Sequence, residues 1–223
     1  MSLIDYPGKI AAVLFTVGCN FRCGFCHNPE LVLSSDFKVE RINEKEIFDF
    51  LKSRQGLLEG VVITGGEPTL QNDLLEFVRK IKNLGFLMKI DTNGANPEMI
   101  EKLNQEKLVD FWAMDIKAPL EKYKAVAGAP INLEDIKKSI ELIKKSGADY
   151  EFRATLVEGT HTAEDVLEMA KMIGGAKKFI LQKFVSREKL VNPDFVGRKS
   201  LSVDELKKIA EQCRPWVEKC EIR

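Results

Sequence analysis

Short apolar runs alternate with longer amphipathic segments along nearly the whole chain. Compact runs of apolar and β-branched residues, closed by glycine, asparagine, proline or a charged residue, are typical of strands. Six such runs occur, at residues 10–16, 60–64, 87–91, 109–116, 150–157 and 179–184, and residues 216–223 are a further candidate. The pattern therefore predicts strands at regular intervals from one end of the chain to the other.

Between these runs, apolar residues recur with the 3.6-residue period of a helix that buries one face. The period is clear at residues 47–51, 74–84 and 136–143. Asn43 with Glu46, and Ser202 with Glu205, have the spacing of a capping box, which predicts that helices begin there.

Strands that alternate with helices imply a parallel sheet with crossover helices. Six β/α units in 223 residues fall short of the eight units, in about 250 residues, of a complete barrel. We therefore expect an α/β fold: a partial, open-sided (β/α)6 TIM-like barrel with a parallel sheet. No linker, repeat or low-complexity segment divides the chain, which predicts a single domain over residues 1–223.

Charge and hydropathy argue against general nucleic-acid binding, a membrane span and a signal peptide. The 34 basic residues balance 34 acidic ones, so no general attraction to nucleic acid or to an anionic membrane is expected. The longest apolar run, residues 10–15, is far shorter than the ~20 residues of a membrane span. Asp5, Pro7 and Gly8 interrupt the start before the apolar core of a signal peptide could form. We expect a cytoplasmic protein.

Residues 17–42 break the regular pattern. Ordinary βα loops have about 2–6 residues, and longer loops inside compact domains are usually functional. This loop contains three of the five cysteines, and it leaves the carboxyl end of the first predicted strand. Because parallel α/β sheets place their sites at that edge, the loop is a candidate for the functional site.

The cysteines of the loop, Cys19, Cys23 and Cys26, are spaced C-x3-C-x2-C, which lets three thiolates converge on one inorganic centre. A structural zinc ion needs four ligands, and His27 is adjacent to Cys26, so it cannot easily wrap onto the same ion. A four-iron cluster normally takes four thiolates; with three, one iron stays open to an outside ligand. A catalytic iron–sulfur site is therefore favoured over the alternatives, a zinc-binding module or an iron–sulfur electron carrier.

With Phe25 before its third cysteine, this motif resembles the signature of the radical S-adenosylmethionine (SAM) superfamily. The resemblance implies a [4Fe-4S] cluster held by Cys19, Cys23 and Cys26, whose open iron is chelated by the methionine moiety of SAM. It also implies reductive cleavage of SAM to methionine and a 5′-deoxyadenosyl radical.

The second predicted strand ends in Thr64-Gly65-Gly66-Glu67-Pro68. Alone, this segment is an ordinary Gly-Gly turn. Beside the cysteine motif, it resembles the GGEP motif of the superfamily, which holds the amino group of the methionine moiety. Two glycines permit close backbone approach, and Glu67 supplies an acceptor for an ammonium group.

Later strand ends carry polar residues in the same order as the glycyl-radical-enzyme activating branch: Asp91, Thr92 and Asn93, then Asp115 and Lys117, and finally Arg153. The resemblance implies that Asp91, Thr92 and Asn93 lie beside the carboxylate and ribose of SAM, and that Asp115 and Lys117 lie close to the ribose. It also implies that Arg153 meets the carboxylate, to which a guanidinium binds bidentately. The alternative for residues 91–93 is a plain turn, and the alternative for Asp115 with Lys117 is a solvated surface pair. For Arg153 the alternative is a core ion pair.

Residues 2–9 and 26–30 resemble the anaerobic ribonucleoside-triphosphate reductase activating proteins. The resemblance implies an activase that forms a glycyl radical on a partner enzyme, with flavodoxin or ferredoxin as electron donor. The sixth predicted strand departs from the best-known activases, because it ends Leu181-Gln182-Lys183-Phe184 without a histidine, and Gln182 is the candidate replacement. The alternative function is a radical SAM enzyme for a small molecule or a modified base.

Overall fold

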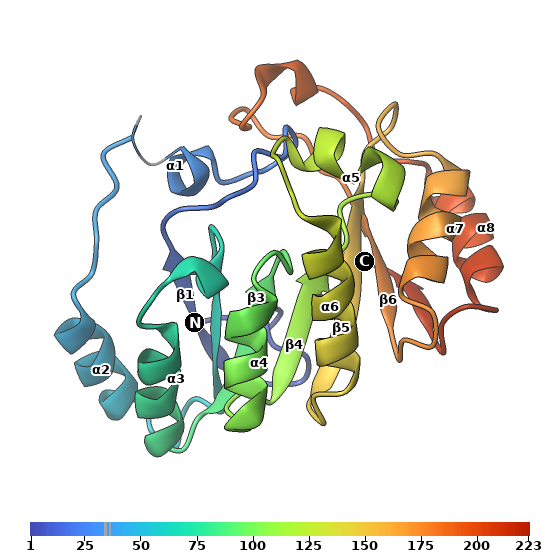
Figure 1. Cartoon of the computed structure of the whole chain (residues 1–223). Helices are drawn as coiled ribbons and strands as arrows, with labels where there is room; N and C mark the ends of the chain where they lie inside the picture. The colour runs from blue at the N-terminus through green and yellow to red at the C-terminus, as the bar shows by residue number, and fades with distance from the viewer. Residues whose placement is uncertain (34, 36) are drawn as a thin grey trace.

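Figure 1 shows the computed structural model, which describes every residue except 34 and 36. Within the described chain, seven parallel strands form one sheet in sequence order. They are β1 (Ala11–Thr16), β2 (Gly60–Gly65), β3 (Leu87–Thr92), β4 (Phe111–Asp115), β5 (Asp149–Leu156), β6 (Phe179–Lys183) and β7 (Cys220–Ile222). The sheet does not close, so the expected open-sided α/β barrel is confirmed. The candidate strand at residues 216–223 exists as the short β7.

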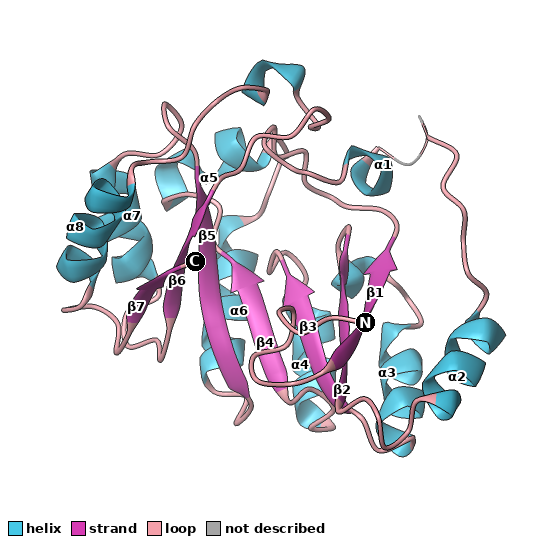
Figure 2. Ribbon diagram, turned by 180° about the vertical axis from the view of Figure 1, so that it is seen from behind, coloured by secondary structure: helices cyan, strands magenta, loops and turns pink. Residues whose placement is uncertain are grey.

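The helices lie over one face of the sheet, and Figure 2 shows the other face open toward the viewer. They are α1 (Pro29–Val32), α2 (Glu44–Ser53), α3 (Leu74–Asn83), α4 (Pro97–Gln105), α5 (Leu120–Ala127), α6 (Leu133–Lys144), α7 (Ala163–Met172) and α8 (Val203–Cys213), with 3-10 turns η1 (Pro68–Leu70) and η2 (Pro193–Phe195). No helix of the described residues is long and apolar enough to cross a membrane.

Helix starts follow the side-chain chemistry that the sequence indicates. Ser202 and Glu205 form the predicted capping box of α8, each side chain bonding to the other residue's backbone N–H. At α2, the Asn43 side chain accepts from the N–H of Glu46, so this start has a simple cap where a full box was expected. One helix, α1, lies inside the loop for which the sequence predicts no regular structure.

Alternation along the strands gives the sheet two unlike faces. Trp112, Ile90 and Phe152 are fully buried on the face that the helices cover. The open face carries the residues in between, and there the register sets Asp115 directly opposite Arg153. The polar side chains of neighbouring strands are thereby brought into contact near the carboxyl ends of the strands.

The chain before β1 covers the opposite end of the open face. Ser2 forms an antiparallel bridge with Ala11 of β1. The buried ring of Tyr6 lies 5.9 Å from that of Phe111, and it packs with Ala11 and Val62 in a small apolar cluster. From β1 to β4, the open face is therefore apolar near the amino ends of the strands and polar near their carboxyl ends.

Candidate active site

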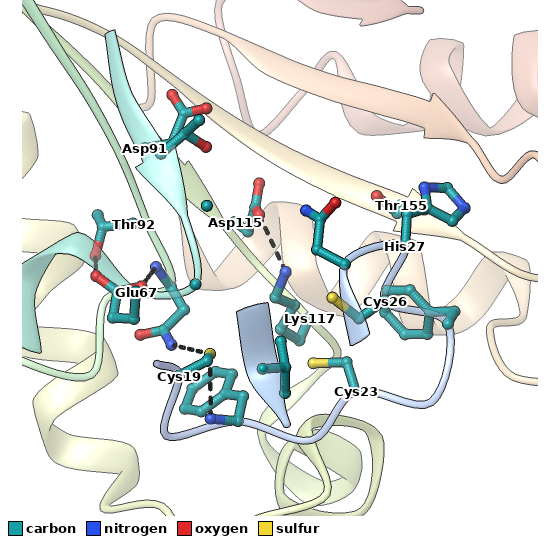
Figure 3. A pocket seen from close by; sticks show the side chains of 18 of the residues that line it. Cys19, Cys23, Cys26, His27, Glu67, Asp91, Thr92, Asp115, Lys117 and Thr155 are labelled. Carbon is teal, nitrogen blue, oxygen red and sulfur yellow. Dashed lines mark hydrogen bonds and ion pairs between the residues drawn. The ribbon is translucent and has the colours of Figure 1, made fainter. Parts of the chain in front are cut away.

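A cavity of about 220 Å³ lies at the carboxyl ends of the strands, under the loop that follows β1 (Figure 3). All the candidate residues except Gln182 line it: Cys19, Cys23, Cys26, Phe25, Gly65, Gly66, Glu67, Asp91, Thr92, Asn93, Asp115, Lys117 and Arg153. The structure therefore brings together side chains from the loop and from the ends of four strands.

The cysteine loop is held in place by backbone hydrogen bonds from two distant segments. The N–H of Arg22 donates to the carbonyl of Ala127 at 2.7 Å. From the connection after β6, the N–H groups of Val191 and Asn192 donate to the carbonyls of Cys26 and Gly24 at 3.2 and 3.0 Å. The position of the thiols is thus fixed by the fold.

The three thiols are free and surround a space. Burial raises the pKa of Cys23 to about 11, although the nearby Lys117 ammonium opposes the shift. Within the described residues, no three His, Cys, Asp or Glu side chains converge closely enough for a single metal ion. This arrangement does not fit one zinc ion as it stands, whereas three thiols around one cavity fit a larger iron–sulfur cluster with an open iron.

Close packing against the end of β1 and the start of the cysteine loop explains why two glycines occur at the end of β2. A Cβ on Gly66 would lie 2.1 Å from the carbonyl oxygen of Gly18, so only glycine lets these two backbones pass. Gly65 has a φ of +110°, and a Cβ there would lie 2.5 Å from the backbone nitrogen of Thr16. Both glycines therefore let the β2 turn pack against the end of β1 and the start of the loop.

Glu67 is fully buried and links the ends of β2 and β3. Its Oε1 accepts from the N–H and hydroxyl of Thr69 and from the hydroxyl of Thr92, and its Oε2 accepts from the N–H of Asn93 at 2.7 Å. Burial raises the pKa of the carboxyl, and these donors oppose the shift. The two oxygens of a carboxylate offer about four lone-pair sites, and Oε2 accepts only the Asn93 N–H from the described residues, so it has room for one more donor.

A chain of opposite charges crosses the open face from β3 to β5. The Lys89 ammonium bonds to Asp91, and Arg153 donates from Nη1 to Asp91 at 3.3 Å and from Nε to Asp115 at 2.8 Å. Lys117 donates to the other oxygen of Asp115 at 3.0 Å. Burial opposes ionisation of Asp115, but the two cations outweigh it and hold the pKa of this carboxyl well below its ordinary value.

Arg153 thus forms the core ion pairs that were the alternative reading of its sequence position. Its Nη2 donates to no described residue, and this nitrogen can still meet a bound carboxylate. Lys89 is a member of the network that the sequence analysis missed, because a lysine inside a strand gives no sign of its partners. Alternation from Arg153 could have identified Thr155, which also lines the cavity.

His27 lies where the sixth strand ends. Its ring stacks on Phe184 with the centroids 5.5 Å apart, and its Nε2 is 2.8 Å from the carbonyl oxygen of Val185. His27 lines the cavity, whereas Gln182, the candidate from the sequence, is not among its lining residues. A histidine therefore reaches this end of the site from the cysteine loop.

No role is expected for His161 from the sequence, but in the structure its ring is hydrogen-bonded to the backbone of Lys117. Its Nδ1 accepts from the N–H of Val157 at 3.1 Å, so Nε2 carries the proton and donates to the carbonyl of Lys117 at 2.9 Å. Burial lowers the pKa of the imidazole. His161 is a structural residue beneath the charged chain.

Comparison with known proteins identifies the architecture. The family model of the Radical SAM superfamily matches residues 13–177. The chain belongs to this superfamily. A protein of Methanocaldococcus jannaschii named "Putative glycyl-radical enzyme activating enzyme MJ1227" is 35% identical over 231 aligned residues, covering 100% of this chain and 92% of its own. The radical SAM chain described here is thus an enzyme of the glycyl-radical enzyme activating group, and its cofactors are a [4Fe-4S] cluster and SAM.

Other relatives match less of their own length. The pyruvate formate-lyase-activating enzyme of Listeria monocytogenes is 37% identical over 131 residues, covering 52% of this chain and 50% of its own. Streptococcus suis SuiB bound to S-adenosylmethionine has the same fold, with a TM-score of 0.71 at 14% identity, over 96% of this chain and 50% of its own. The matched regions cover about half the length of each of these two proteins.

Proposed function

We propose that this radical SAM enzyme installs a glycyl radical on a separate partner enzyme, and that the partner is an anaerobic ribonucleoside-triphosphate reductase. The observation that carries the proposal is the single cavity in which three free thiols face the charged chain of β3, β4 and β5. The full-length relative named as a glycyl-radical enzyme activating enzyme supports the reaction class. The proposed partner rests on residues 2–9 and 26–30, and the proposed place of action is the cytoplasm.

Different residues are assigned to the cluster and to SAM. Cys19, Cys23 and Cys26 would hold the cluster, which together with bound SAM would supply the one-electron reductive cleavage chemistry. Arg153 binds the carboxylate of SAM through its remaining nitrogen, and Glu67 accepts the ammonium group at Oε2. A guanidinium and a buried carboxylate discriminate strongly for these two charged groups.

The charged chain then positions the rest of SAM. Asp91 and Asp115 are fixed from both sides by cations, so neither carboxylate can turn freely when the cofactor enters. We assign Asp91, Thr92 and Asn93 to the side of the carboxylate and ribose, and Asp115 and Lys117 to the ribose. Because the hard chemistry belongs to the cofactors, catalysis by the protein consists of placing the sulfonium, the cluster and the target Cα–H within reach.

Iron binding tests the cluster ligands. Anaerobic reconstitution is expected to give about four irons per chain. Replacing Cys19, Cys23 and Cys26 by alanine should abolish iron uptake, whereas Cys213→Ala with Cys220→Ala, the matched control, should leave it unchanged. Stoichiometric zinc without iron uptake under reducing conditions would contradict the assignment.

Electron paramagnetic resonance tests the reaction. The reduced, reconstituted protein is mixed with SAM and the candidate reductase in the absence of air. A doublet glycyl signal with formation of 5′-deoxyadenosine supports the proposal. If 5′-deoxyadenosine forms but no glycyl radical enzyme of the same cell gains a radical, the activase function fails, and a small-molecule substrate takes its place.

A further inference from the structure

Two cysteines outside the candidate active site lie together at the β7 edge of the sheet. Cys213 is the last residue of α8, and Cys220 is the first residue of β7. The chain turns back directly after the helix, where the N–H of Trp216 donates to the carbonyl of Cys213 at 2.9 Å. As a result α8 packs against β7 (Figure 2), and the two side chains meet between these elements.

The thiols of Cys213 and Cys220 are free and in contact with each other. The Cys220 thiol donates a hydrogen bond to the sulfur of Cys213, which lowers the pKa of Cys213 and raises that of Cys220. Within the part of the chain that the structure describes, no third His, Cys, Asp or Glu joins the pair as a metal ligand. Thiols that already share a hydrogen bond need only a short movement to reach bonding distance.

The two thiols differ in their access to solvent. Cys213 is fully buried in the hydrophobic core, whereas Cys220 is partly exposed and packs against that core. A reagent from outside therefore reaches Cys220 first. The buried thiol is then the neighbour that attacks the modified sulfur, because thiol–disulfide exchange proceeds through a mixed disulfide and a second thiolate.

We propose that Cys213 and Cys220 form a reversible disulfide in the folded protein, with a low-molecular-weight disulfide as the oxidant. The Cys220 thiolate attacks one sulfur of the oxidant, releases one small thiol and remains in a mixed disulfide. The Cys213 thiolate then attacks the Cys220 sulfur, and the bond to the small molecule breaks as the second thiol leaves. Two electrons and two protons pass from the pair to the oxidant, which becomes two thiols.

The disulfide fastens the shortest strand of the sheet to the helix before it. β7 has three residues, and among the described strands it pairs with β6 alone. Arg223 follows β7 directly and donates two bonds of 3.0 Å each to the buried Glu151 of β5. When the edge of the sheet opens, a cross-link to α8 keeps β7, and with it Arg223, close to its place.

Peptide mapping tests the cross-link. The reconstituted protein is equilibrated without air in buffers that range from reduced to oxidised glutathione, then alkylated and digested with trypsin. Cleavage after Lys219 separates the two cysteines, so the disulfide should join a peptide that ends at Lys219 to residues 220–223. Absence of the joined peptide at every glutathione ratio, or a disulfide between two chains in its place, overturns the proposal.

Single variants test the order of the two steps. In oxidised glutathione, Cys213→Ala should stop after the first step and keep one glutathione on Cys220, because no second thiol displaces it. Cys220→Ala, the matched variant, should take up at least ~10-fold less glutathione, because its remaining thiol is buried. Equal uptake in the two variants overturns the two-step route.

Thermal unfolding and amide exchange test what the disulfide does to β7. The oxidised wild type should unfold about 5 °C above the reduced protein, as a short disulfide ring predicts. Amide exchange of residues 220–223 should slow on oxidation, whereas that of β1, the strand at the opposite edge, should not change. The Cys213→Ala, Cys220→Ala variant should show neither difference between the two buffers. Equal unfolding temperatures and equal exchange in the two forms of the wild type would overturn the role of the disulfide in holding β7.

Discussion

The two faces of the sheet are formed by alternate residues of the same strands. Both faces bury side chains, but one buries apolar groups and the other buries paired charges. On the helix-covered face, Ile90, Trp112 and Phe152 are removed from water and have no charge to compensate. On the open face, Lys89 and Arg153 are removed from water against Asp91 and Asp115. One sheet thus has a face suited to stabilising the fold, which the helices cover, and a face suited to binding a ligand, which is open.

Apolar burial contributes about 25 cal/mol per Å² of area removed from water, so the helix-covered face stabilises the fold directly. Buried ion pairs lose much of their Coulomb energy to desolvation, and apolar residues of similar volume often replace them without loss. The charged chain is therefore a poor way to stabilise a sheet and a good way to hold fixed charges for a ligand.

The largest expected effect is on the apolar face. Trp112 is fully buried, and Trp112→Ala should lower the free energy of unfolding by about 3–5 kcal/mol through lost burial and a cavity. Denaturant titration measures this loss. SAM affinity of the folded variant should stay as in the wild type. The control is Trp216→Ala, since Trp216 is 43% exposed; an equal loss in both variants would contradict the comparison.

On the charged face the effect should fall on the ligand. Arg153→Ala should weaken SAM binding about 10–100-fold, because one charge-assisted hydrogen bond is worth roughly 1.5–3 kcal/mol. Equilibrium binding to the reconstituted protein measures it, with Arg79→Ala as the exposed arginine control. A wild-type affinity in Arg153→Ala would show that this residue serves only its ion pairs with Asp91 and Asp115.

A smaller effect is expected deeper on the same face. Arg223 donates two bonds of 3.0 Å each to Glu151, which is only 1% exposed. Arg223→Ala leaves this carboxylate buried without its partner and should lower the free energy of unfolding by about 1–3 kcal/mol. Adding Glu151→Gln should recover part of the loss in a double-mutant cycle. Strictly additive losses would show that the two side chains do not depend on each other.

The smallest expected effect depends on pH. Because burial lowers the pKa of His161 in the folded protein, the unfolded chain binds more protons, and stability is lost as pH falls below the unfolded value of about 6.5. The slope for one proton cannot exceed ~1.4 kcal/mol per pH unit. Thermal unfolding between pH 7 and pH 5 measures it. The variant His161→Gln should show a flatter profile than the wild type, and an unchanged profile would contradict the assignment.

The sequence predicts the strands well because apolar runs with clear ends are a local signal. Within one or two residues, β1 to β6 lie where the pattern places them. The start of α5 was missed because Pro119 precedes it without a side-chain cap, and α1 was missed because four residues are too few to show a period. The three residues of β7 depend on pairing with β6 more than on their own pattern.

The candidate site was predictable as a set of residues, but the contacts among them were not. Glu67 is satisfied by Thr92 and by the N–H of Asn93, which lie 25 and 26 residues further along the chain. The contact of Arg153 with Asp91 skips a strand, since β4 lies between β3 and β5, and it therefore depends on the curvature of the sheet. Motif spacing contains no information on that curvature.

The backbone clamp on the cysteine loop also bears on the order in which the molecule assembles. Arg22 bonds to Ala127 and Gly24 bonds to Asn192, so the segment with the thiols closes chain loops of more than a hundred residues. Contacts this far apart in sequence form late, because the entropy of loop closure opposes them until the intervening elements are in place. A nascent chain that has just emerged with its cysteines therefore lacks both segments of the clamp. If these cysteines hold the cluster as proposed, we expect iron insertion to follow synthesis and folding of residues up to about 192.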